Sequence, residues 1–431
     1  MRIIQIVPGT GNFHCGTCLR EHALARGLRR LGQDVLMAPL YLPLVLEREA
    51  DGEGDGRAIF FGGVNIFLQQ KSKLFDHTPR WLDRWLDAPA LLRRLAERSG
   101  STRASQLGVM TVSMLRGDEG RQNKELARLC AWLAKEARPD IVCLGTGLLV
   151  GLARRIKSAT GAAVMCTLHG EDAFLDGLPE PYREQAWSTM RARARDVDVL
   201  LPVSRYYGDV MTRRLELPQE RVHVVHNGIE LDGLEPGPPP QHPTIGFLAR
   251  MCPGKGLATL ADAYLILRSR GRVADLKLRI AGAKTGSDEA FVRELRTKFE
   301  AAGALDDVTF APNLDREQKV AFLRTLTVLS VPATYGEAFG LYILEALACA
   351  VPVVQPRHGA FPEVLAATGG GTLCNPDDAE DLAAVLEKTL LTPESSRAEA
   401  RRARQIVVEK FSADRMARQV LDMCEKTLRE V

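Results

Sequence analysis

The sequence contains no apolar run that approaches the ~20 residues needed to cross a bilayer. Its first residues, Met1–Val7, lack the basic start and the long apolar stretch of a secretory signal peptide. Cysteine is scarce, with nine residues in 431, and most of the nine stand singly in apolar runs, as at Cys143 and Cys349. Cysteine at such positions acts as a small hydrophobic residue. We therefore expect a cytoplasmic protein.

A strong charge of one sign is also missing. The chain has 57 Lys and Arg against 54 Asp and Glu, a net charge of +3. Residues 1–221 hold 32 basic and 26 acidic residues, a net charge of +6, and the remainder holds 25 and 28, a net charge of −3. Without a dense basic stripe or stacking aromatics, nucleic acid is excluded as the expected partner. The small basic excess of the first half still favours an anionic partner there.

The chain is long enough for two or three domains, each with its own core. It has 431 residues, of which 45% are apolar and 26% are charged. These proportions are close to the average for a globular protein. A length of ~100–200 residues per domain is typical, so a single small module is excluded.

The first half alternates continuous apolar strands with helical segments. Such alternation is typical of a parallel sheet covered on both faces. The expected strands are 3–7, 35–38, 140–144, 163–168 and 198–204, and the expected helices include 19–31 and 148–157.

A Pro-rich stretch, Pro236–Pro243, interrupts this alternation, and the pattern then starts again. We expect an α/β fold of two doubly wound, Rossmann-like domains that face each other across a cleft. The predicted boundaries are a first domain at 1–225, a linker at 226–243, a second domain at 244–408, and a C-terminal helix at 409–431 that crosses back to the first domain. Ligands of such sheets bind beyond the carboxyl ends of the strands, so the site is expected in the cleft.

Residues 51–120 are the hardest part to interpret. Residues 62–67 resemble a strand. In the following segment, Trp81, Trp85 and several leucines line one side of a helical stretch that also carries arginines. This stretch is either a helix that packs within the domain or an amphipathic helix that docks on a membrane or an acceptor. Both interpretations remain open.

Two loops of the second half carry the strongest chemical signals. The first runs from Tyr335 to Leu347 and contains Glu337 and Glu345, eight positions apart. The apolar run after Gly340 opens a helix, whose first N–H groups attract anions. Eight helical positions correspond to about 12 Å, close to the distance from the sugar to the ribose of a nucleotide sugar. Alone, such a glutamate pair is most often structural.

The second loop is 246–256, which places Arg250 and Lys255 directly after a strand, with glycines that allow close backbone approach. Arginine offers a fork to two phosphate oxygens, and lysine offers a movable charge. Together the two cations suit a diphosphate, although loop cations often only face water.

Histidine and cysteine mark two sites in the first half. His169 follows the expected strand 163–168, in Thr-Leu-His-Gly, where a histidine is often only a structural residue. The segment 14–22 contains Cys15, Gly16 and Cys18 with flanking histidines. We favour a donor-side loop in which Gly16 allows close backbone approach. A metal or thiol site and simple packing remain alternatives.

Together these residues resemble the retaining family 4 glycosyltransferases, whose two-domain architecture is called GT-B. The matching segments span most of the chain, from about residue 1 to about residue 425. They are Thr167–Gly170, Val203–Ser204, His226–Ile229, the Arg250/Lys255 loop, the Glu337/Glu345 motif and Val351–Glu363. The sequence departs from the family at 14–18, where a glycine-rich loop is usual.

The resemblance implies a role for each candidate residue. Glu337 would face the donor sugar and, with His169 at the reacting sugar, would be catalytic. The implied donor-binding residues are Gly16, Arg250 and Lys255 at the diphosphate, Glu345 at the ribose, Asn313 at the base, and the backbone amides of Phe339, Gly340 and Leu341.

The implied function is transfer of a sugar, of hexosyl type, from a nucleoside diphosphate sugar such as a UDP-sugar to an acceptor hydroxyl, with retention of configuration. No cofactor and no metal is expected, because the cations would stabilise the leaving diphosphate. The acceptor would be a sugar or a lipid-linked molecule bound by the first domain, with peripheral contact at the inner membrane face as an option. The alternatives are a nucleotide-sugar epimerase of the same architecture and a non-catalytic scaffold that binds nucleotide sugar. An oxidoreductase is disfavoured, because no complete Gly-x-Gly-x-x-Gly follows an early strand.

Overall fold

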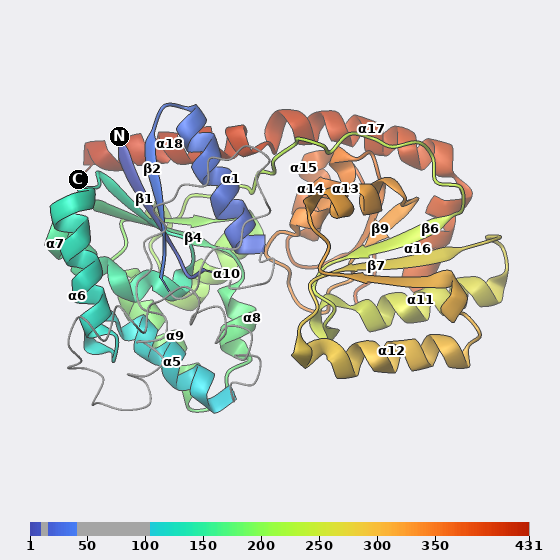
Figure 1. The fold of residues 1–431 in the computed structure, drawn as a ribbon, viewed down its shortest axis with the longest axis horizontal. Coiled ribbons are helices and arrows are strands. Elements are labelled where there is room, and N and C mark those ends of the chain that lie inside the picture. The colour runs from blue at the N-terminus through green and yellow to red at the C-terminus, as the bar shows by residue number, and fades with distance from the viewer. Residues whose placement is uncertain (10–15, 41–103, 431) are drawn as a thin grey trace. The chain divides into compact units, whose positions relative to one another are not determined.

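The computed structural model describes residues 1–9, 16–40 and 104–430. The chain divides into two compact units (Figure 1). Unit 1 consists of Met1–Asn227 together with Ala413–Val431, and unit 2 consists of Gly228–Ser412. The expected strand at 62–67, the Trp81/Trp85 stretch and Cys15 lie outside the described residues.

Unit 1 contains a five-stranded parallel sheet in the order β2-β1-β3-β4-β5. Ile3 of β1 is the partner of Val35 in β2 and of Ile141 in β3, so β1 lies between these two strands. This order is that of a doubly wound sheet whose switch point lies between β1 and β3. The strands are β1 (Arg2–Val7), β2 (Asp34–Pro39), β3 (Ile141–Leu144), β4 (Ala163–Leu168) and β5 (Val199–Pro202).

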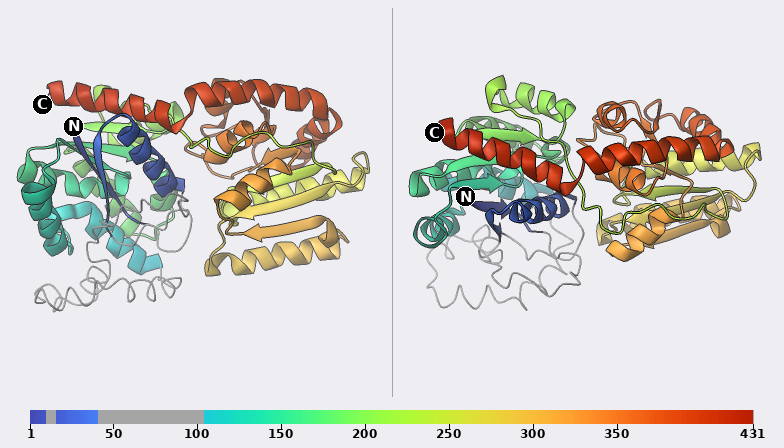
Figure 2. Two further views of the ribbon diagram at one scale, coloured as in Figure 1. Left: turned by 45° about the horizontal axis from the view of Figure 1, so that its top comes forward. Right: turned by 90° about the horizontal axis from the view of Figure 1, so that it is seen from above.

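Helices surround this sheet, and the last helix of the chain is among them. α18 packs against α1, and their apolar residues share one buried core with the strands (Figure 2). Gly27 of α1 permits this approach, because an added Cβ would lie 2.7 Å from the Cβ of Ala417. The expected helix that crosses back to the first domain is therefore confirmed. The helices are α1 (Gly16–Arg30), α5 (Ala104–Arg116), α6 (Asn123–Trp132), α7 (Ala153–Thr160), α8 (Glu171–Asp176), α9 (Tyr182–Ala194), α10 (Arg205–Leu215) and α18 (Ala413–Glu430).

Unit 2 contains a six-stranded parallel sheet in the order β11-β10-β9-β6-β7-β8. The chain begins at β6, adds β7 and β8 on one side, and returns to place β9 on the other side of β6. Its switch point therefore lies between β6 and β9, where doubly wound sheets bind their ligands. The strands are β6 (Thr244–Leu248), β7 (Lys277–Gly282), β8 (Val308–Pro312), β9 (Val328–Ser330), β10 (Val353–Pro356) and β11 (Thr372–Cys374).

The helices of unit 2 cover both faces of this sheet. Figure 1 shows α11 and α12 on one side of the strands and α14 on the other, as right-handed crossovers require. The helices are α11 (Leu257–Arg270), α12 (Glu289–Ala301), α13 (Arg316–Arg324), α14 (Leu341–Ala348), α15 (Phe361–Thr368), α16 (Ala379–Leu391) and α17 (Pro393–Lys410).

The Pro-rich segment belongs to unit 2, which begins at Gly228. Three arginines of this unit donate hydrogen bonds to carbonyl groups just before and within this segment. Arg316 Nη2 lies 2.8 Å from the oxygen of Asp232, Arg324 Nη2 lies 3.0 Å from that of Gly233, and Arg397 bonds that of Gly237. Proline cannot pair with a sheet, so the arginines supply the donors that such a segment needs. Among the described residues, no helix is long and apolar enough to cross a membrane.

Candidate active site

The switch point of unit 2 brings together one cation and one carboxylate from the two predicted loops. Lys255 lies in the 3₁₀ turn Pro253–Lys255 that follows β6, and Glu337 lies in the loop that follows β9. Lys255 Nζ donates a hydrogen bond to Glu337 Oε2 at 2.5 Å, and only 18% and 12% of the two side chains are exposed. The structure therefore joins two residues that stand 82 positions apart in the sequence.

A glycine makes this meeting possible. Gly256 has a φ of +73°, and an added Cβ would lie 1.6 Å from the carbonyl oxygen of Pro332. The two loops also share a backbone hydrogen bond, which Thr334 N donates to Gly254 O at 3.0 Å. Only glycine allows both this backbone conformation and this close approach, so Gly256 sets the position of Lys255 next to the β9 loop.

Two tyrosines complete the surroundings of this ion pair. The ammonium of Lys255 lies 4.8 Å from the ring centroid of Tyr335, and the hydroxyl of Tyr342 donates to Glu337 Oε2 at 3.2 Å. Burial opposes the charge on Lys255, but the carboxylate of Glu337 outweighs it and raises the pKa of Lys255. Burial, with Glu337 nearby, raises the pKa of Tyr335 to about 12. At neutral pH the lysine is charged and the Tyr335 phenol keeps its proton.

Arg250 has a different partner in this structure. Its Nη2 and Nε atoms donate to the two oxygens of Asp288 at 3.0 Å and 3.2 Å, and Nη2 also donates to Ser287 Oγ at 3.1 Å. Burial alone would raise the pKa of Asp288, but the hydrogen bonds from Arg250 and Thr285 outweigh it and lower that pKa. The predicted second cation is thus held at the start of α12, with 49% of its side chain exposed.

The second glutamate of the motif lies on a helix, whereas the first does not. α14 begins at Leu341, after Gly340 with a φ of +86°. Only Glu345 is therefore helical, so the two glutamates are not joined by the eight helical positions on which the predicted separation of about 12 Å rests. Glu345 Oε1 accepts a hydrogen bond from Lys319 Nζ of α13 at 2.8 Å. The first N–H groups of α14 point out of its N-terminus, as in any helix.

Asn313 joins two loops at the carboxyl ends of β7 and β8. Its side-chain oxygen accepts from Lys284 N at 3.0 Å, and its side-chain nitrogen donates to Lys284 O at 3.2 Å. The side chain of this predicted base-contacting residue therefore already makes two hydrogen bonds to the backbone of Lys284. Its own N–H donates to Gly282 O at 2.9 Å.

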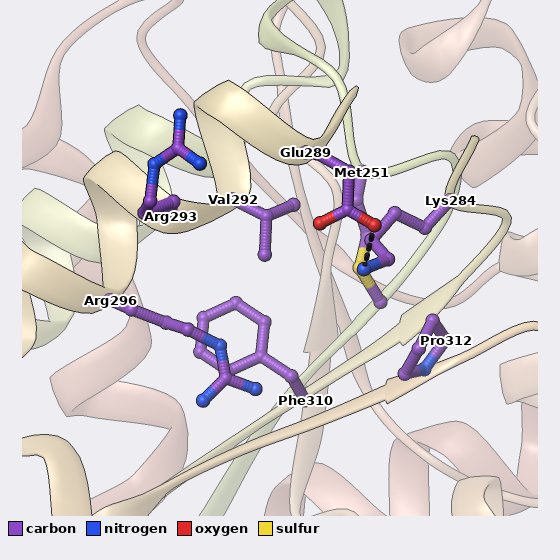
Figure 3. A pocket seen from close by; sticks show the side chains of 8 residues that line it. All are labelled: Met251, Lys284, Glu289, Val292, Arg293, Arg296, Phe310 and Pro312. Carbon is purple, nitrogen blue, oxygen red and sulfur yellow. Dashed lines mark hydrogen bonds and ion pairs between the residues drawn. The ribbon is translucent and has the colours of Figure 1, made fainter. Parts of the chain in front are cut away.

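A cavity of about 100 Å³ lies beside this junction. Figure 3 shows an apolar floor with charged groups around it, and the guanidinium of Arg296 lies 4.4 Å from the ring centroid of Phe310. Lys284 Nζ donates to Glu289 at 2.6 Å. The lining residues are Met251, Lys284, Glu289, Val292, Arg293, Arg296, Phe310 and Pro312.

In unit 1, His169 follows β4 and its backbone is held by a buried carboxylate. Glu171, the first residue of α8, accepts hydrogen bonds on Oε2 from His169 N at 2.9 Å, Gly170 N at 3.1 Å and the hydroxyl of Tyr207 at 2.8 Å. Its Oε1 accepts from Thr146 Oγ1 and Gly147 N, both at 2.8 Å. Two loops and helix α10 therefore meet at one carboxylate, which sets the backbone of the predicted catalytic histidine.

The imidazole of His169 contacts a second buried carboxylate. Its Nε2 lies 3.4 Å from Oε1 of Glu21 on α1. Gly16 is the exposed first residue of that helix, and Cys18 is buried two positions later. Over the described ranges, no group of three or more His, Cys, Asp or Glu side chains is arranged to hold a metal ion.

Sequence reasoning missed several partners of the candidate residues. Glu21 stands in the segment 14–22, but its contact with His169 spans 148 positions and has no local signal. Lys319 and Asp288 also come from helices outside the motifs. Tyr342, five positions after Glu337, is the partner that the motif itself contained.

Both units match known protein families. Residues 235–406 match the family described as "Glycosyl transferases group 1", and residues 88–232 match the family described as "Glycosyltransferase Family 4". The chain is 30% identical over 305 residues to the MMP α-(1→4)-mannosyltransferase of Mycolicibacterium hassiacum, over 68% of this chain and 71% of that protein. This chain belongs to the family 4 glycosyltransferases.

This family 4 member is similar to further proteins. It is 32% identical over 182 residues to the D-inositol 3-phosphate glycosyltransferase of Mycolicibacterium smegmatis, and the match spans 40% of each protein. Its fold resembles that of sucrose-phosphate synthase from Thermosynechococcus elongatus, with a TM-score of 0.72, 18% identity and full coverage of both chains. It also resembles Anabaena HepE, solved in complex with UDP-glucose, with a TM-score of 0.69, 15% identity and coverage of 99% and 100%. These neighbours confirm the predicted GT-B fold class.

Proposed function

We propose that this chain is a retaining glycosyltransferase that moves a sugar from a nucleoside diphosphate sugar to an acceptor hydroxyl without a metal. The observation that carries this proposal is the Lys255–Glu337 pair at the switch point of unit 2. Family membership supports glycosyl transfer, and the solved neighbour HepE binds UDP-glucose. A UDP-sugar is accordingly the first donor to test.

The proposed reaction breaks the bond between C1 of the sugar and the diphosphate. The acceptor oxygen forms a new bond to C1 on the same face, and its proton passes to a diphosphate oxygen. The charge that develops on the diphosphate is stabilised by the ammonium of Lys255, by the N–H groups at the start of α14, and by Arg250. Glu337, which Tyr342 holds by a hydrogen bond, contacts the hydroxyls of the transferred sugar.

The nucleoside end is assigned to the ends of β7 and β8. The cavity in Figure 3 has the apolar floor and the few polar groups that suit a planar base. Because the side chain of Asn313 bonds Lys284, the base is read by backbone groups of that turn. Glu345, near the N-terminus of α14, accepts hydrogen bonds from the ribose hydroxyls in place of Lys319.

The experiment is a thermal-shift panel of UDP, GDP and ADP and their sugars, followed by turnover with EDTA present. A ligand that binds only the folded protein raises the melting temperature. NMR of the product then reports the configuration at C1. Retention with EDTA is expected. No binding of any of these compounds, or an inverted product, contradicts the proposal, and isomerisation of the sugar without an acceptor would indicate an epimerase.

The acceptor is proposed to be a sugar or a lipid-linked molecule. The net charge of +6 over residues 1–221 motivates an anionic acceptor or membrane surface for the first half. Sedimentation with anionic liposomes at low salt, compared with neutral liposomes, tests this idea. Equal recovery with both kinds of liposome would refute contact with an anionic surface.

A further inference from the structure

One fully buried carboxylate of unit 1 has no part in the transfer reaction as proposed. The side chain of Glu21 on α1 is 0% exposed, as is that of its neighbour Arg20. Glu21 Oε1 accepts from Arg20 Nη1 at 2.5 Å, and Oε2 accepts from Gln5 Nε2 of β1 at 3.1 Å. Burial alone favours the neutral acid, but the Arg20 guanidinium and the contact with His169 outweigh it and lower the pKa of Glu21. Glu21 is therefore a carboxylate at neutral pH.

Arg20 in turn is held by hydrogen bonds to two other segments of unit 1. Arg20 Nε donates to Asn227 Oδ1 at 3.2 Å, and Nη1 also contacts Thr167 Oγ1 of β4 at 3.3 Å. The pair thus connects α1 with β4 and with the His-Asn-Gly motif at the end of unit 1. Such a network costs free energy to desolvate, which favours a specific use for it.

The third group on this carboxylate is the imidazole of His169. Its Nε2 lies 3.4 Å from Glu21 Oε1, and within the described part of the chain this is the only partner of the ring. A carboxylate only accepts hydrogen bonds, and a neutral imidazole has one donor and one acceptor nitrogen. In the neutral ring this contact requires the hydrogen on Nε2, and Nδ1 then carries the lone pair. The side chain retains 9% exposure.

We propose that Glu21 is a positioning residue that holds neutral His169 as the Nε2–H tautomer, so that Nδ1 accepts a hydrogen bond from a substrate hydroxyl. Glu171 fixes the backbone of the histidine and Glu21 fixes its ring. A hydroxyl is the substrate group that fits, because Nδ1 of the neutral ring can pair only with a donor. The hydrogen bond from a substrate hydroxyl to Nδ1 rests on the proposed function. The tautomer of His169 does not depend on any activity.

The tautomer is tested on the wild-type, full-length protein labelled with ¹⁵N-histidine. Long-range ¹H–¹⁵N correlation spectra distinguish a ring nitrogen that carries hydrogen from one that does not. They are recorded above the ordinary histidine pKa of about 6.5, and the spectrum of His169→Gln assigns the signals. We expect hydrogen on Nε2 alone. Hydrogen on Nδ1, or an even mixture of tautomers, would overturn the proposal whatever the activity.

The substitution Glu21→Gln keeps the shape but replaces the carboxylate by an amide that both donates and accepts. We expect a mixture of tautomers, a fall of roughly 10–100-fold in kcat, and a donor KM that changes less than about threefold. The matched control is Glu387→Gln, which alters a buried carboxylate paired with Arg272 in unit 2. The control should leave the His169 signals unchanged.

The outcomes separate this proposal from the proposed function. An altered tautomer with unchanged kcat would refute a role for Nδ1 in turnover. The predicted tautomer in a protein that transfers no sugar would support the Glu21–His169 pair and count against the glycosyltransferase. Should Glu21→Gln fail to fold, the wild-type spectrum still decides the tautomer.

Discussion

The carboxylate of Glu171 offers the most direct test of how the structure holds His169. Five donors converge on it, three of them backbone N–H groups and two of them hydroxyls. The side chain is buried, so water cannot replace a lost acceptor. The substitution Glu171→Gln keeps the size of the side chain and leaves a single acceptor oxygen.

The expected cost follows from which donors the amide can still satisfy. With its oxygen at the position of Oε2, glutamine keeps His169 N, Gly170 N and the hydroxyl of Tyr207. The hydroxyl of Thr146 can rotate to accept from the amide nitrogen. The N–H of Gly147 can only donate, so it loses its acceptor. One buried N–H without an acceptor costs about 1–3 kcal/mol. We expect unit 1 to lose about 2 kcal/mol, which lowers its melting temperature by roughly 4–8 °C.

Tryptophan fluorescence isolates this effect, because all four tryptophans lie between residues 81 and 187, within unit 1. Urea unfolding followed by this signal gives the free energy of unfolding of unit 1. Glu220→Gln is the matched control, since that glutamate is exposed in the same unit, and it should change stability by less than about 0.5 kcal/mol. If Glu171→Gln also changed the free energy of unfolding by less than about 0.5 kcal/mol, the five-donor assignment would be refuted.

Four further predictions concern unit 2 and the docking of α18. Glu337→Gln should lower kcat roughly 100-fold, with little change in nucleotide affinity. Arg250→Ala combined with Lys255→Ala should weaken nucleoside diphosphate binding at least about tenfold. Near-normal binding by this double variant in calorimetry would refute the diphosphate assignment. Gly27→Val should destabilise unit 1 by about 1–3 kcal/mol because its Cβ meets α18, and unchanged unfolding by tryptophan fluorescence would argue against that packing. Because the pKa of Asp288 is lowered, its stabilising effect is present at neutral pH and is lost as pH falls through that pKa. Between about pH 6 and about pH 3, Asp288→Asn should therefore lose less stability than the wild type in urea unfolding followed by circular dichroism. An equal loss in both proteins would contradict this.

Much of the fold follows from local pattern. The predicted strands at 3–7, 35–38 and 163–168 match β1, β2 and β4 within one or two residues. Each is a short, continuous apolar run, and such a signal needs no distant contact.

The sequence predicts the individual site residues that stand in a local motif, but not the contacts between residues of different loops. The motifs located Glu337, Lys255 and His169, but they did not show which side chains pair. Arg250 was grouped with Lys255, yet it bonds Asp288, since the side chain of a residue after β6 can reach either neighbouring loop. The partner that it takes is set by how α12 begins.

The sequence by itself determined the two doubly wound sheets, the return of the last helix and the loops that carry charge, because periodicity and glycine placement act over a few residues. Only the tertiary structure decided that Glu21 meets His169, that Glu171 gathers five donors and that Lys255 bonds Glu337. These pairs depend on strand order and on the switch points of the sheets. Strand order places Glu21 and His169, which stand 148 positions apart, within hydrogen-bonding distance, and no local pattern encodes that contact.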